Sequence, residues 1–93
     1  MRRLVLASLL LVGAAASVSG RDLPADVSAF VAKREQCDHF REEPPGDAAR
    51  RQEIAAALEA SCRGTDARLK ALKQKYRSGP VRALLNGFEE EIE

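Results

Sequence analysis

The two cysteines of this chain, Cys37 and Cys62, constrain its fold more than any other feature. Without its first twenty residues, a predicted signal peptide, the chain of 93 has 73 residues left. A domain of that size buries too little apolar surface to offset the entropy of folding by a wide margin, so it commonly depends on a cross-link. An even number of cysteines in an exported chain favours a disulfide. We therefore predict a Cys37–Cys62 disulfide, which in the chain-entropy model stabilises such a fold by about 3–4 kcal/mol.

The first twenty residues, MRRLVLASLLLVGAAASVSG, have the pattern of a secretory signal peptide. Two arginines precede an apolar run, and small residues follow with two possible cleavage points, after Ala16 and after Gly20. The apolar run is too short to cross roughly 30 Å of hydrocarbon as a membrane anchor. We therefore expect residues 1–20 to be a signal peptide and residues 21–93 to form one small periplasmic or secreted domain without a transmembrane segment.

The charge of the predicted mature chain is close to zero. Its leader carries two of the 15 basic residues and none of the 14 acidic ones, so cleavage changes the formal net charge from +1 to −1. Nucleic-acid binding depends on a strong positive field, and single-stranded binding also uses aromatic stacking platforms. Only four per cent of the residues are aromatic, so we expect no nucleic-acid partner.

Pro44 and Pro45 end the first predicted helix, which begins near Pro24. In a simple helical hairpin, Cys37 would lie near the end of this helix, while Cys62 would lie about 22 Å beyond the start of the next one. Disulfide-linked Cα atoms are only about 4.4–6.8 Å apart. We therefore predict that Arg41 to Gly46 is an extended linker, which lets the C-terminal ends of both helices meet. The predicted inner face of the first helix consists of Val27, Phe30, Val31, Arg34 and Cys37.

Two or three further helices are predicted, and no run of residues has a strand pattern. Asp47 and Thr65 are the expected N-caps of the second and third helices, Gly64 the stop between them, and Pro80 the start of a fourth. The residues expected to face inward are Ile54, Leu58 and Cys62, then Leu69, Leu72 and Tyr76, then Val81, Leu84, Leu85, Phe88 and Ile92. The predicted fold is all-α, a three- to four-helix domain with one disulfide.

Cys37, Asp38 and His39 are residue types that bind zinc, and a cysteine beside a histidine can also act as a nucleophile. Zinc needs three or four ligands, but this histidine is the only one in the chain. Residues 37 and 39 also lie about 200° apart around a helix, which prevents joint action. We therefore predict no catalytic residue, no cofactor and no metal ligand, and expect that the protein is not an enzyme.

The third predicted helix carries a concentration of basic residues, which suggests an interaction patch for an acidic partner or anionic lipid. The alternative is internal pairing, because the sequence ends in FEEEIE and a returning fourth helix would bring those acids beside the basic stripe. The residues of this candidate patch are Arg68, Lys70, Lys73, Lys75 and Arg77.

Two resemblances extend this interpretation. The leader, followed by AFVAKREQCDHFREEPP and SCRGTDARLKALKQKYRSGPVRALLNGFEEEIE, resembles short exported helical proteins of Gram-negative bacteria without an assigned function. Cys62, Leu69, Leu72 and Tyr76 resemble the pattern of periplasmic lysozyme-inhibitor-type helical domains, although Lys73 replaces an acid of that family. The first resemblance implies no mechanism. From the residues themselves we expect a non-enzymatic exported module that acts on a protein or envelope component. Inhibition of an exported hydrolase and periplasmic metal binding are the alternative functions.

Overall fold

The computed structural model describes residues 22–93, so the predicted signal peptide and its cleavage points lie outside the described part. The described chain is helical, as predicted, and has no strand. Its helices are α1 (Ala25–Glu42), α2 (Ala48–Cys62), α3 (Thr65–Lys75) and the short α4 (Gly79–Leu85). None of these helices combines the length and apolarity needed to cross a membrane.

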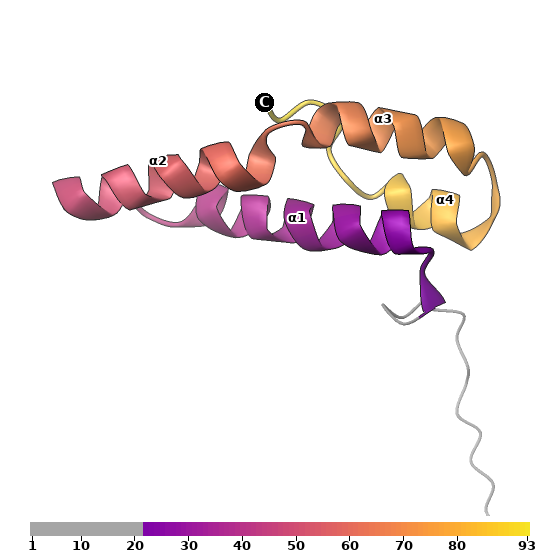
Figure 1. Ribbon diagram of the computed structural model, residues 1–93, viewed down its shortest axis with the longest axis horizontal. Coiled ribbons are helices and arrows are strands. Elements are labelled where there is room, and N and C mark those ends of the chain that lie inside the picture. Colours follow the sequence, from indigo (N-terminus) through magenta and orange to yellow (C-terminus); the bar gives the residue numbers. More distant parts are fainter. Residues whose placement is uncertain (1–21) are drawn as a thin grey trace, which may run out of the picture.

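The helices α2 and α3 follow one another along the length of α1 and run antiparallel to it (Figure 1). Helix α2 lies against the C-terminal half of α1, while α3 and α4 lie over the N-terminal half of α1. Gly64 joins α2 to α3 in a left-handed conformation with φ of 81°, as expected for a glycine that ends a helix. The chain after α4 returns to this junction, where the described part ends.

The main hydrophobic core joins α1, α3 and α4, and it excludes α2. Its buried residues are Val27, Phe30, Leu69, Leu72 and Leu85. Phe88 packs its ring edge against Phe30, with ring centroids 5.1 Å apart. In α2, only Ile54 and Ser61 are buried, and Leu58 is half-buried instead of belonging to the core as predicted. The second helix is therefore held mainly by its contact with α1 and by the disulfide.

The Cys37–Cys62 disulfide is present, with Cα atoms 4.8 Å apart. Beyond this bond α1 continues for about 7 Å to Glu42, whereas α2 extends back about 21 Å to its start, at 1.5 Å per residue. Consequently, the N-terminal half of α2 projects past the end of α1 (Figure 1). The intervening chain has to cover the difference of about 14 Å, as predicted from the positions of the cysteines.

The linker that covers this distance is Glu43–Asp47, which is shifted from the predicted Arg41 to Gly46. Only the residue directly before a proline is excluded from the helical conformation, so α1 continues through Arg41 and Glu42. Glu43 is extended, with ψ of 131°. At the other end, the Asp47 side chain accepts a hydrogen bond of 2.8 Å from the Arg50 amide, which confirms the predicted N-cap.

Deleting Pro44, Pro45 and Gly46 is expected to prevent formation of the internal disulfide. The deletion removes about 10 Å of reach and leaves less than the distance that the linker covers. We expect the exported variant to accumulate with free thiols or as an intermolecular dimer, as read by thiol labelling under denaturing, non-reducing conditions. Replacement of the same three residues by Ala-Ala-Gly is the control. A deletion variant that forms the internal bond as readily as the parent would show that linker length does not limit closure.

Two other predicted helix boundaries were wrong. Thr65 is the first residue of α3 and not its N-cap, and its buried hydroxyl donates to the carbonyl of Cys62 at 2.8 Å. The fourth helix ends at Leu85 and does not continue to Ile92. Beyond Gly87 the chain is no longer helical. Its acidic residues form hydrogen bonds with side chains of α1 and α3 instead of continuing the helix.

Candidate functional site

The charged residues of α3 lie on two different sides of the helix. Leu69 and Leu72 face the core, and this orientation fixes the direction of every other side chain on the helix. Lys70 and Lys73 occupy one side, beside the chain that follows α4, and Arg77, two residues past the end of the helix, lines the same surface. The candidate patch predicted from the sequence is therefore divided by the helix itself, with Arg68 and Lys75 on the opposite side.

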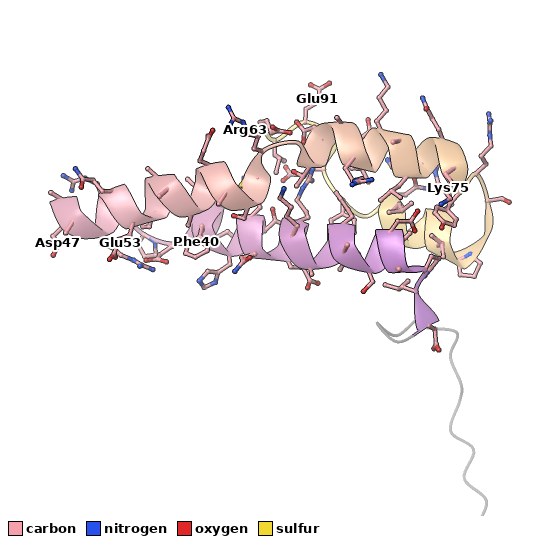
Figure 2. All side chains as sticks on the ribbon, in the orientation of Figure 1. Phe40, Asp47, Glu53, Arg63, Lys75 and Glu91 are labelled. Atoms are coloured by element: carbon pink, nitrogen blue, oxygen red, sulfur yellow. A yellow bond between two sulfur atoms is a disulfide. The ribbon has the colours of Figure 1, made fainter. Side chains whose placement is uncertain are left out.

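Lys75 is part of an ion pair that joins the end of α3 to the start of α1. Its ammonium group donates to the Asp26 carboxylate at 2.8 Å, and the Tyr76 hydroxyl donates to the same carboxylate at 3.0 Å. Figure 2 shows Lys75 at this end of α3, close to α1. The hydrogen bond from Lys75 lowers the pKa of Asp26, and the same bond raises the pKa of Lys75. Lys75 therefore helps to hold the end of α3 against the start of α1.

The other side of α3 forms a concave surface, which we call the charged groove. Its basic residues are Lys70, Lys73, Arg77 and Arg82, and its acidic residues are Asp66, Glu90 and Glu91. Gly79, with φ of 90°, allows the turn that brings α4 and Arg82 back beside α3. The Arg82 guanidinium donates to the carbonyl of Lys73 at 2.7 Å and to the side-chain oxygen of Asn86 at 3.0 Å, so its position is fixed.

Internal pairing accounts for only part of the positive charge in the groove. The ammonium group of Lys73 donates to Glu90 at 2.7 Å, and this bond lowers the pKa of the Glu90 carboxyl. By contrast, Lys70 and Arg77 are exposed and have no hydrogen bond or ion pair within residues 22–93. The predicted internal pairing with the acidic segment (residues 89–93) is thus found for Lys73, while Lys70 and Arg77 project freely.

The most connected charged residue is Arg34 of α1, whose side chain is only 1% exposed. Its guanidinium donates to the Thr65 hydroxyl at 3.1 Å, to the Asp66 carboxylate at 3.0 Å and to the carbonyl of Glu89 at 2.7 Å. It also lies over the ring of Phe30, 5.3 Å from the centroid. Arg34 therefore links α1, the start of α3 and the acidic segment.

Asp66 and Glu93 complete this network by reciprocal hydrogen bonds. The Asp66 carboxylate accepts from the backbone amides of Ile92 and Glu93, while the Glu93 carboxylate accepts from the amides of Gly64 and Asp66. Glu93 thereby supplies the cap that the start of α3 lacks, and its negative charge is stabilised by the helix dipole. The acidic segment is consequently fixed at both ends, at Glu89 and at Glu93.

A second charged cluster braces the linker. The Arg50 guanidinium forms a two-pronged pair with the Glu43 carboxylate, with distances of 2.6 and 2.7 Å, and also contacts Glu53 at 3.1 Å. These hydrogen bonds lower the pKa of Glu43 and raise that of Arg50. The sequence patterns considered above do not indicate this pair, because its two residues are seven positions apart on either side of Pro44 and Pro45.

Replacing Glu43 by alanine is expected to lower the melting temperature at pH 7 by a few degrees, whereas Glu42→Ala, at an exposed position, should leave it unchanged. The lowered pKa of Glu43 means that its contribution is present above the ordinary pKa of 4.5 and is lost as the pH falls through the lower folded-state value. The melting temperatures of the parent and Glu43→Ala should therefore converge in acid. Equal melting temperatures at pH 7 would show that the pair does not stabilise the linker.

The stretch around Cys37 does not assemble a metal or nucleophile site. Cys37 is fully buried in the disulfide, whereas the His39 side chain is 68% exposed, so the two residues point apart as predicted. His39 lies 4.0 Å from Glu43 and packs against the ring of Phe40. Within residues 22–93, no three side chains of His, Cys, Asp or Glu gather as metal ligands would.

A shallower surface lies between α1 and α2. It is lined mostly by small residues of both helices, with Phe40 at one end and the buried Ser61 among them. Ser61 donates its hydroxyl to the carbonyl of Ala57, so its polar group is satisfied within its own helix. The surface also includes Gln36 and Lys33, whose ammonium group donates to the carbonyl of Arg63 at 3.3 Å. Since Lys33 is the one charged residue in this lining and already has a partner, the charged groove is the stronger candidate site. Comparisons with protein-family models, with curated proteins and with solved structures gave no match for this chain.

Proposed function

We propose that this chain is an exported, non-enzymatic interaction module that binds a protein or envelope component through the basic side of α3. The observation that carries the proposal is the exposure of Lys70 and Arg77 without a partner in residues 22–93. Most other basic residues of the helical body form ion pairs or hydrogen bonds, as Lys73, Lys75 and Arg82 do. Two unpaired cations, one on a helix anchored in the core and one just past its end, are available to an external partner.

Export is supported by the leader pattern and by the disulfide. Disulfides persist in oxidising compartments, and this one joins α2 to a body whose main core it does not share. A module of this kind suits the periplasm or the extracellular space.

The proposal is tested by site-specific photocrosslinking in cells that export the full chain. A photoreactive residue replaces Gln74, which is exposed and lines the groove, or Gln52, which is exposed on α2 as the matched control. We expect a discrete crosslinked product at Gln74 and none at Gln52. Products of equal yield at both positions, or none at either, would contradict a binding role for this side of α3.

A further inference from the structure

We propose that the charged groove binds an extended acidic peptide segment of its partner, in competition with the chain's own Glu90. This inference rests on the proposed function and names the chemistry of the partner. It follows from the charges left over in the groove, from their spacing along α3 and from the way Glu90 is bound.

The groove retains positive charge after its internal contacts are counted. Among its acids, Asp66 is paired with Arg34 and Glu90 with Lys73. Lys70, Arg77 and Arg82 then remain against a single acid, Glu91. Glu91 does not neutralise them within the described part of the chain, because it is exposed and forms no hydrogen bond or ion pair there. Figure 2 shows Glu91 near the start of α3, at the opposite end from Lys75.

The spacing of the basic residues fits an extended chain. Lys70 and Lys73 are about 4.5 Å apart along the helix axis, at 1.5 Å per residue, and Arg77 follows the end of the helix after the extended Tyr76. In an extended peptide, side chains on the same side recur every two residues, or about 6.6 Å. Acids at alternate positions can therefore contact successive basic residues of the groove, with the flexible lysine and arginine stems accommodating the small mismatch.

The contact of Glu90 indicates how a carboxylate is bound. Its oxygen lies 2.7 Å from the ammonium group of Lys73, whose side chain is only 13% exposed, while the Glu90 side chain itself is 71% exposed. An exposed carboxylate contributes little net affinity and is readily replaced by another. Lys73 is thus a preformed carboxylate site, and Glu90 is an occupant that an external acid can displace.

A membrane surface fits this groove less well than a peptide. Helices that bind at a bilayer surface insert large apolar side chains beneath their basic residues. The leucines of α3 are buried in the core, and the residues beside its basic stripe on the outer face are Ala67 and Gln74. The groove is edged by cations and offers no large exposed apolar side chain for insertion into a bilayer, so it fits a peptide better than a membrane surface.

The test measures binding of a fluorescent peptide with four glutamates at alternate positions to the full oxidised protein by anisotropy at low salt. The same peptide with glutamines and vesicles of anionic or neutral phospholipid are the comparison ligands. We expect saturable binding of the glutamate peptide, weaker binding at higher salt, and no preference for anionic vesicles. Absence of peptide binding, or binding to anionic vesicles alone, would overturn the proposal.

Three variants locate the binding site. The double variant Lys70→Glu with Arg77→Glu should weaken binding about tenfold, since it reverses two exposed contacts. Glu90→Gln should strengthen binding about twofold, because it frees Lys73. Arg68→Glu changes an exposed cation on the opposite side of the same helix and should have little effect. Equal weakening by Arg68→Glu and by the groove variant would show non-specific attraction and overturn the assignment to the groove.

Two readouts separate this inference from the proposed function. Unchanged circular dichroism and melting temperature establish that each variant is folded. If the crosslinked product forms through Gln74 but the glutamate peptide does not bind the purified protein, the interaction module stands and the acidic-peptide inference fails. If no product forms at all while the peptide still binds in the groove, the proposed cellular function fails and the groove assignment stands.

Discussion

Replacing Cys37 and Cys62 together by alanine is expected to lower the free energy of unfolding by about 3–4 kcal/mol. The disulfide closes a loop between residues 25 positions apart, and α2 has only Ile54 and Ser61 buried besides it. Small domains are stable by roughly 0.05–0.15 kcal/mol per residue, so this loss is a large share of the total. Urea unfolding followed by far-ultraviolet circular dichroism measures it.

Alanine is the appropriate replacement because Cys37 is fully buried, and a serine hydroxyl at that position would add the cost of an unpaired polar group. Chemical reduction of the unmodified protein provides the matched control and should give the same direction of change. A double variant as stable as the oxidised parent would contradict the role of the disulfide. It would then follow that the contact between α1 and α2 holds the second helix by itself.

Arg34→Met is expected to destabilise the protein by about 2–4 kcal/mol. The substitution removes hydrogen bonds to Thr65, Asp66 and Glu89 and leaves the partly buried Asp66 carboxylate without its cation. Thermal or urea unfolding gives the value. Arg41→Ala is the control, because Arg41 also contacts Glu89 but is 35% exposed, so its loss should amount to less than about 1 kcal/mol.

The pairing of Arg34 with Asp66 can be separated from simple packing by a double-mutant cycle. If the two charges act as a pair, Arg34→Met combined with Asp66→Asn should cost less than the sum of the single substitutions. Asparagine retains an oxygen that can accept from the amides of Ile92 and Glu93, which keeps part of the network. Strict additivity would show that the pairing with Asp66 does not stabilise the fold and that Arg34 acts through its other contacts, with Thr65, the Glu89 carbonyl and Phe30.

Local signals in the sequence were sufficient to predict the helical class and several boundaries. Pro24, Asp47, Gly64 and Pro80 each act through backbone conformation or a hydrogen bond within a few residues, so their effects can be read from neighbouring residues alone. The disulfide and the extended linker were predictable for a similar reason. Both follow from chain length and helix rise, which do not depend on how the remaining side chains pack.

The network around Arg34 could not be derived in the same way. Its partners are 31, 32 and 55 residues away, and no local pattern indicates which of many carboxylates or carbonyls a given arginine will meet. One signal was nevertheless present. The helical spacing placed Arg34 on the same face as Phe30 and Cys37, and a charged residue on a buried face requires a partner. The early end of α4 was missed because it depends on the same distant contacts.

The projection of α2 beyond α1 implies that the molecule does not open uniformly. None of the residues from Ala48 to Glu53 is buried, and their side-chain contacts are confined to the linker and to their own helix. Helical turns without tertiary packing fray at low free-energy cost, whereas those near Cys62 are held by the disulfide. Amide protons should therefore exchange with solvent fastest at the start of α2 and progressively more slowly toward its end. Opening of this kind proceeds away from the charged groove and leaves the basic side of α3 in place.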